Sequence, residues 1–167
     1  MRRIALLTLL GSLALALSSC IIVGTIPVSS FRFDSNWQRN TDGAYVFCTN
    51  KTTQMRYKFR APDSSVISSI QERYDGFASN NTLTINRPIG DLTREGNDLV
   101  FFRELTFGQN GTPQSLPPGV SQQSIVINPI TPPPAINGKT TVTVTVTTIS
   151  GSQYSGSYIY ETYANCP

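Results

Sequence analysis

The sequence predicts an all-β protein, an antiparallel immunoglobulin-like β-sandwich of about seven to nine strands with one disulfide. Two observations lead to this prediction. Apolar and polar residues alternate with period two through most of the chain after Phe31, as they do in strands that bury one face. Turn-forming pairs, such as Asp42-Gly43 and Asn137-Gly138, separate these runs at the short intervals that are typical of sandwiches and barrels.

Alternation places each expected strand along the chain. Residues 140–148 alternate valine with threonine, and residues 54–60 alternate Met55, Tyr57 and Phe59 with polar or basic side chains. Apolar side chains at every second position would line the inside of a sheet, because successive side chains of a strand point to opposite faces. The expected strands are 31–37, 44–48, 54–60, 82–87, 99–107, 123–128, 140–148 and 153–164.

Two kinds of segment interrupt this pattern. Residues 113–119 and 128–134 are rich in proline. They are expected as loops or irregular edges, because proline has no N–H for a central strand. The second is residues 62–74, in which Val66, Ile70 and either Arg73 or Tyr74 have helical spacing. Asp63 or Ser64 could cap such a helix. A short helix is therefore expected near residues 64–74.

The N-terminus has the pattern of an export signal. Arg2 and Arg3 precede an apolar run over residues 4–17, and such a charged start followed by an apolar stretch is typical of a secretory signal peptide. Residues 17–20, Leu-Ser-Ser-Cys, resemble the lipobox of bacterial lipoproteins. In that family the peptide is cut before the cysteine, which carries the acyl chains. The resemblance therefore implies that Cys20 is lipidated.

This resemblance sets the expected organisation of the chain. Residues 1–19 would be the cleaved signal peptide, residues 20–30 the lipidated N-terminus with a short tether, and residues 31–167 a single β-sandwich domain. The domain would then be held by its acyl chains on the extracytoplasmic side of a bacterial envelope membrane. Two alternatives remain: an uncleaved apolar helix extended by residues 21–23, which is long enough to span a bilayer, or a cytosolic protein with a buried N-terminal helix.

Composition excludes several classes of function. The chain contains no histidine, so it has neither a Ser-His-Asp triad nor a His-ligated zinc site. Removal of residues 1–19 takes away Arg2 and Arg3 and leaves 11 basic and 10 acidic side chains, a net charge of +1. This balance offers no attraction to nucleic acid. We therefore expect no enzyme activity, no catalytic residue, no metal, no cofactor and no nucleic-acid partner.

The cysteine count predicts the disulfide. If Cys20 is acylated, Cys48 and Cys166 are the two cysteines that remain, and they can pair in one way. The bacterial envelope is oxidising enough for such a bond to persist. The alternative is a pair of free thiols.

Two groups of side chains are candidates for ligand binding. Arg56, Lys58 and Arg60 share one face of the strand expected at 54–60, where they could meet phosphates or acidic sugars or simply form a solvated outer face. Aromatic rings could instead stack on sugar rings or fill the core. The aromatic candidates are Trp37, Tyr154, Tyr158, Tyr160 and Tyr163.

These observations favour a non-catalytic envelope lipoprotein with a structural or binding β-domain, whose partners are the membrane and an envelope protein or glycan. The first alternative is a carbohydrate-binding module that uses exposed tyrosine or tryptophan. A remote alternative is a hydrolase, which would need two facing carboxylates.

Overall fold

The structure is a computed structural model that describes residues 28–76, 82–107, 113–115, 125–131 and 136–167. These residues form strands and two short 3₁₀ turns. In chain order the elements are β1 (Ser29–Ser35), β2 (Trp37–Arg39), β3 (Tyr45–Cys48), β4 (Thr53–Arg60), η1 (Ser64–Val66), β5 (Ile67–Gly76), β6 (Thr82–Arg87), η2 (Ile89–Asp91), β7 (Thr93–Glu95), β8 (Asp98–Phe107), β9 (Pro113–Ser115), β10 (Asn128–Ile130), β11 (Ile136–Thr148) and β12 (Gln153–Tyr163).

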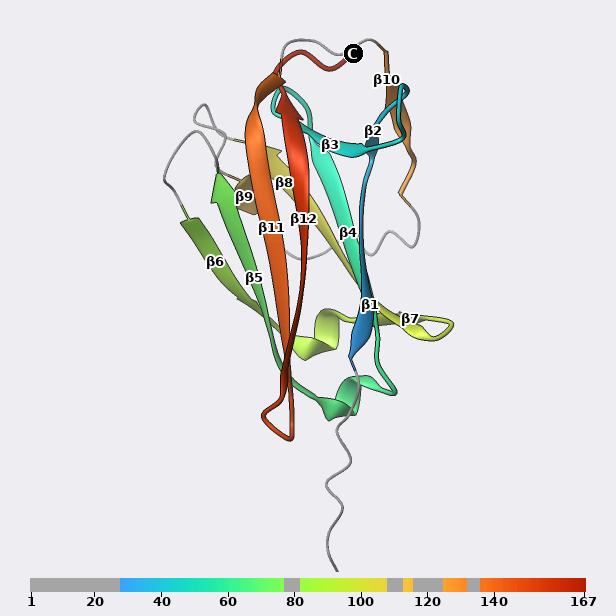
Figure 1. The fold of residues 1–167 in the computed structure, drawn as a ribbon, viewed down its shortest axis with the longest axis vertical. Helices are drawn as coiled ribbons and strands as arrows, with labels where there is room; N and C mark the ends of the chain where they lie inside the picture. The colour runs from blue at the N-terminus through green and yellow to red at the C-terminus, as the bar shows by residue number, and fades with distance from the viewer. Residues whose placement is uncertain (1–27, 77–81, 108–112, 116–124, 132–135) are drawn as a thin grey trace, which may run out of the picture.

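The strands form two sheets, so the all-β prediction is confirmed. The smaller sheet has the order β1-β4-β8-β7, and β9 also pairs with β8. The larger sheet has the order β10-β2-β3-β12-β11-β5-β6. Figure 1 shows β11, β12 and β5 in front of β4 and β8, so the two sheets lie face to face.

Long antiparallel pairings form the middle of the larger sheet. β11 pairs with β12 on one side and with β5 on the other. Two short pairings are parallel, β3 with β12 and β2 with β10. The predicted antiparallel arrangement therefore describes the long pairings but not these two, in which the paired strands run in the same direction.

The core lies between the two sheets and follows the alternation in the sequence. Val142, Val144 and Val146 of β11 are fully buried, whereas the threonines between them are partly exposed. Met55, Tyr57 and Phe59 of β4 face them from the other sheet and are also fully buried. Burial of one such apolar side chain contributes about 1.5–3 kcal/mol, so these two strands supply much of the hydrophobic stabilisation.

The helix expected near residues 64–74 is absent. Asp63 caps only the single 3₁₀ turn η1, through its carboxylate and the N–H of Ser65, and β5 begins at Ile67. Ile70 and Tyr74 are both buried on one face of β5. Positions four apart share a face in a strand as well as in a helix, so their spacing did not separate the two structures. The β-branched and serine residues of this stretch favour the strand.

Proline-rich segments lie at sheet edges where they are described. Pro113 begins β9, which pairs with β8, and Pro129 lies in β10 at the edge of the larger sheet. The prediction of edge positions is confirmed for these two prolines, and residues 116–119 and 132–134 lie outside the described residues.

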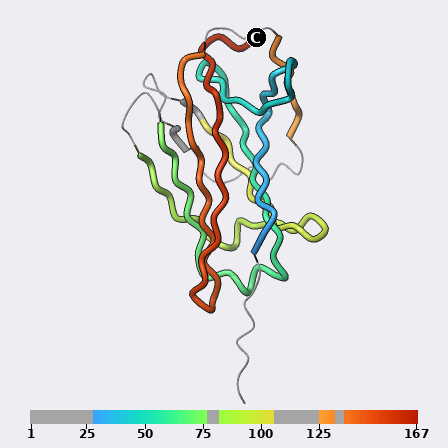
Figure 2. The backbone as a smooth tube through the Cα atoms, in the orientation of Figure 1, coloured from blue at the N-terminus to red at the C-terminus, as the bar shows by residue number. Residues whose placement is uncertain are grey.

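The two ends of the body carry different features. The turn between β11 and β12 lies at one end, and the C-terminus lies at the opposite end, beside the turn between β2 and β3 (Figure 2). β1 begins in the half of the body that holds the β11–β12 turn (Figure 1). The described chain therefore begins in the half of the body away from the C-terminus.

Candidate functional site

Lipidation of Cys20 stays a prediction of the sequence, because residues 1–27 lie outside the described residues. Across the segments that the structure describes, no helix has both the length and the apolar character needed to cross a bilayer.

The basic stripe of β4 lies on the outer face of the smaller sheet, and much of its charge is balanced. The Arg56 guanidinium binds the Asp34 carboxylate at 2.6 Å, and the Nε atom of Arg60 lies 3.9 Å from the Asp98 carboxylate. Lys58 lies between these two pairs on the same face and is partly exposed. A strand face with alternating charges of both signs is typical of a solvated surface, and it offers little net attraction to an anionic polymer.

Most of the aromatic candidates are packed inside the body. Trp37 is 7% exposed, and Tyr160 and Tyr163 are fully buried. Tyr160 stacks on Phe47 with ring centroids 3.9 Å apart. Core packing is therefore the role in which the structure places these three rings.

The two remaining tyrosines are half-buried against the same core. Tyr158 stacks on Phe33 with ring centroids 6.2 Å apart, and its hydroxyl accepts a hydrogen bond from the backbone N–H of Tyr45. Tyr154 lies on the same inward face of β12. The five aromatic candidates do not form an exposed platform for a sugar ring.

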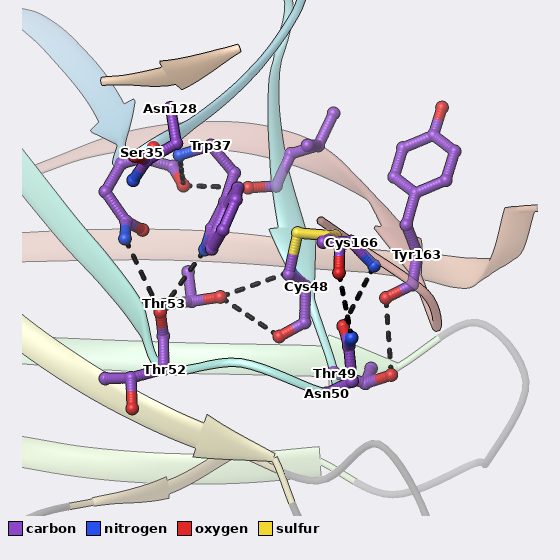
Figure 3. The surroundings of a disulfide bond; sticks show 12 residues. Ser35, Trp37, Cys48, Thr49, Asn50, Thr52, Thr53, Asn128, Tyr163 and Cys166 are labelled. Atoms are coloured by element: carbon purple, nitrogen blue, oxygen red, sulfur yellow. Dashed lines mark hydrogen bonds between the residues drawn. A yellow bond between two sulfur atoms is a disulfide. The ribbon is translucent and has the colours of Figure 1, made fainter. Parts of the chain in front are cut away.

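The predicted disulfide joins Cys48, the last residue of β3, to Cys166, which follows β12 (Figure 3). The Cα atoms are 5.9 Å apart, within the usual range for a disulfide. Both cysteines are buried in a small cluster with Trp37 and Tyr163. The bond therefore belongs to the core at this end of the body.

Hydrogen bonds hold the C-terminal segment beside this disulfide. The side-chain amide of Asn50 donates to the Cys166 carbonyl and accepts from the Cys166 N–H, both at 3.0 Å (Figure 3). The backbone N–H of Thr49 donates to the Tyr163 carbonyl at 2.8 Å. On the other side, the Trp37 indole N–H donates to the Thr52 carbonyl at 3.2 Å. These hydrogen bonds fix the C-terminal segment beside the end of β3, and the disulfide leaves neither of these two cysteines as a free thiol.

A second cluster of polar groups, which we call the buried charge cluster, lies between the two sheets. It consists of Tyr57 from β4, Glu72 and Tyr74 from β5, Arg87 from β6 and Arg103 from β8. Glu72 and Arg103 are the buried charged residues among those the structure describes. A charge in an apolar interior is costly unless it is paired, so each partner matters.

Glu72 is held by four neighbours. Its Oε2 atom accepts hydrogen bonds from Arg103 Nη1 at 2.7 Å, from the Tyr74 hydroxyl at 2.9 Å and from Arg87 Nη2 at 3.1 Å. Its Oε1 atom accepts from the Tyr57 hydroxyl at 3.1 Å and lies 2.9 Å from Arg87 Nε. Four hydrogen bonds and the close ion-pair contact of Arg87 Nε surround this carboxylate.

The surroundings of the cluster change the proton affinity of its members. Burial raises the pKa of Glu72, although Arg87 and the hydrogen bonds from Tyr74 and Tyr57 oppose the shift. Burial, together with the negative charge of Glu72, raises the pKa of Tyr57 and Tyr74 well above that of a free tyrosine. The two hydroxyls therefore stay protonated and act as donors.

Aromatic rings flank both guanidinium groups. Arg87 lies over the ring of Phe101 at 5.3 Å from its centroid, and Arg103 lies over the ring of Tyr74 at 5.6 Å. Cation–π contacts of this kind favour a desolvated arginine.

The sequence already contained a signal for this cluster. Arg103 lies an even number of positions from Leu99, Phe101 and Leu105, so all four side chains share the buried face of β8. Glu72 lies two positions from both Ile70 and Tyr74, so it shares their buried face of β5. The prediction of a helix over residues 64–74 concealed this shared face. A charged residue on the apolar face of a strand predicts a buried partner in the facing sheet.

No family model, curated protein or solved structure matches this chain. Any proposal about function therefore rests on the sequence and structure of this chain itself.

Proposed function

We propose that this protein is a bacterial envelope lipoprotein, anchored through acyl chains on Cys20, whose β-domain has a non-catalytic structural or binding role. The observation that carries the proposal is the use of the three cysteines. Cys48 and Cys166 pair with each other inside the domain, which leaves Cys20 as the thiol at the lipobox. A disulfide that closes this domain also suits an oxidising compartment outside the cytoplasm.

The proposed anchor places the domain close to its membrane. Residues 20–28 connect the anchor to the first described residue. At about 3.3–3.6 Å per residue, these nine residues extend to roughly 30 Å at most. The end that carries the disulfide and the C-terminus would then face away from the membrane, where a partner protein or glycan could reach its loops.

A non-catalytic role is supported by the state of the carboxylates. Asp34, Asp98 and Glu161 are each paired with arginine, and Glu72 is saturated by donors. A hydrolase of the glycosidase type needs two facing carboxyl groups, one of them free to donate a proton. Because the aromatic candidates pack in the core, we propose edges and end loops as the surface for a partner.

An immunoglobulin-like arrangement is the finer fold that we propose. Two sheets packed face to face with a tryptophan beside a disulfide support it. One feature differs from antibody domains, in which the disulfide crosses between sheets. Here Cys48 belongs to β3 of the larger sheet, and Cys166 follows β12 of that same sheet.

The proposal can be tested by expressing the full-length chain in a bacterium that is fed an alkyne-labelled fatty acid. The wild-type protein is expected to take up the label, and mass spectrometry is expected to find a mature chain that starts at residue 20 with acyl groups attached. Cys20→Ala should lose the label. The double variant Cys48→Ala/Cys166→Ala is the matched control and should keep it. A labelled Cys20→Ala protein, or an unmodified wild-type chain starting at Met1, would contradict the proposal.

A further inference from the structure

The buried charge cluster has an excess of positive charge. Glu72 supplies one negative charge, whereas Arg87 and Arg103 supply two positive charges. Arginine does not lose its proton in proteins, so the excess cannot be removed by titration of either guanidinium. A buried positive charge without a counterion is unfavourable.

No other side-chain carboxylate of the chain can supply the missing charge. All ten acidic residues lie within the described residues, and the segments outside them contain neither aspartate nor glutamate. Apart from Glu72, every acidic residue is exposed or partly exposed rather than buried. The C-terminal residue, Pro167, is exposed. The cluster therefore contains a single side-chain carboxylate, and a second carboxylate partner would have to come from outside the chain.

Arg103 offers the atoms that such a counterion would bind. Its side chain is 5% exposed, and its Nη1 atom donates to Glu72. Its Nε and Nη2 atoms are buried and have no hydrogen-bond acceptor in the part of the chain that the structure describes. These two atoms form one edge of the guanidinium, with two parallel N–H groups that match the two oxygens of a carboxylate.

Arg103 lies in a part of β8 that has one neighbouring strand among the described residues. β7 pairs with β8 up to Val100, and β9 pairs with it from Leu105. Between these pairings, the described part of β8 has only β4 as a neighbour. Arg87, whose side chain is 15% exposed, lies in β6 at the edge of the facing sheet. β6 and β9, which lie at edges of the two sheets, are on the same side of the body (Figure 1).

We propose that the free edge of Arg103 binds the carboxylate of a small organic acid between the two sheets. The carboxylate accepts from Nε and Nη2 in a bidentate manner and brings the net charge of the cluster to zero. The rings of Phe101 and Tyr74 flank Arg87 and Arg103, and an ion pair is stronger in low-dielectric surroundings of this kind. The proposal is independent of the lipid anchor.

Isothermal titration calorimetry of the full-length protein in detergent with sodium acetate tests this site. Acetate is expected to bind the wild-type protein, and acetamide, its neutral analogue, is not. Arg103→Met should lose acetate binding while it leaves Glu72 and Arg87 as a balanced pair. Arg60→Met is the matched control, because Arg60 lies on the outer face of β4 and its side chain is 57% exposed, and it should bind acetate as the wild type does.

Arg103→Lys separates bidentate binding from simple charge attraction. Lysine keeps the positive charge but lacks the paired N–H groups, so its affinity for acetate should fall. Near-UV circular dichroism checks that each variant is folded, and the comparison of acetate with acetamide on the wild type needs no variant. Absence of acetate binding to the wild type, equal binding to Arg103→Met, or binding of chloride without binding of acetate would each overturn the proposal.

Discussion

Removal of the disulfide is the perturbation whose magnitude follows most directly from the structure. Cys48 and Cys166 are 118 positions apart, so the bond closes most of the domain into one loop. In the chain-entropy model, a cross-link over this separation lowers the entropy of the unfolded chain and stabilises the folded state by about 5 kcal/mol at 25 °C. Cys48→Ala/Cys166→Ala should therefore lower the free energy of unfolding by about that amount.

Trp37 provides the assay. It is the one tryptophan of the chain, and it is buried in the same cluster as the disulfide. Its emission should shift to longer wavelength when guanidinium chloride unfolds the protein. With a slope of about 4 kcal/mol per molar for a domain of this size, the unfolding midpoint of the double variant should lie about 1 M below that of the wild type.

Two controls isolate the cross-link. Cys20→Ala leaves the disulfide intact and should unfold at the wild-type midpoint. The wild-type protein, unfolded and refolded in a reductant, should behave like the double variant. A double variant whose midpoint differs from the wild type by less than about 0.3 M, which is roughly 1 kcal/mol, would refute the reasoning, because the hydrogen bonds from Asn50 and Thr49 would then suffice to hold the C-terminus.

Three further predictions concern a close contact, the buried charge and an exposed ion pair. Gly156→Ala should cost about 1–3 kcal/mol in chemical denaturation, because its Cβ would overlap the side chain of Phe31, which packs against the core, whereas Gly90→Ala, with nothing within 4 Å, should be nearly neutral. Glu72→Gln should cost about 3–5 kcal/mol by the same assay, because it leaves two buried or half-buried cations unbalanced; a loss below about 1 kcal/mol would contradict this. The hydrogen bond from Arg39 lowers the pKa of Asp42 to about 2, so its stabilising effect should be complete above pH 4 and lost as the pH falls through 2. Carboxyl NMR should find this pKa in the wild type and a higher pKa, closer to 3.8, in Arg39→Met, in which the hydrogen bond from the Ala44 N–H remains.

The alternation of apolar and polar residues in the sequence predicted most of the long strands and which of their faces point inward. The valines of β11 and the apolar residues of β4 are buried as their alternation indicates, because a strand turns successive side chains to opposite faces. The same rule failed to distinguish strand from helix at Ile70 and Tyr74, which are four positions apart and share a face in both. It also left open whether the tyrosines of β12 face solvent or the core, since an inward and an outward aromatic stripe have the same period.

Local sequence predicted most of the long strands, though not β5, and it predicted the edge prolines and, with Cys20 assigned to the lipid anchor, the pairing of Cys48 with Cys166, because each depends on residue type, spacing or count within the chain itself. Only the tertiary structure decided which strands are neighbours, including the parallel pairs of β3 with β12 and β2 with β10. It also decided that Glu72 meets Arg103 across the two sheets, 31 positions apart. The physical reason is that strand pairing and sheet packing are made by contacts distant in sequence, which no local period encodes.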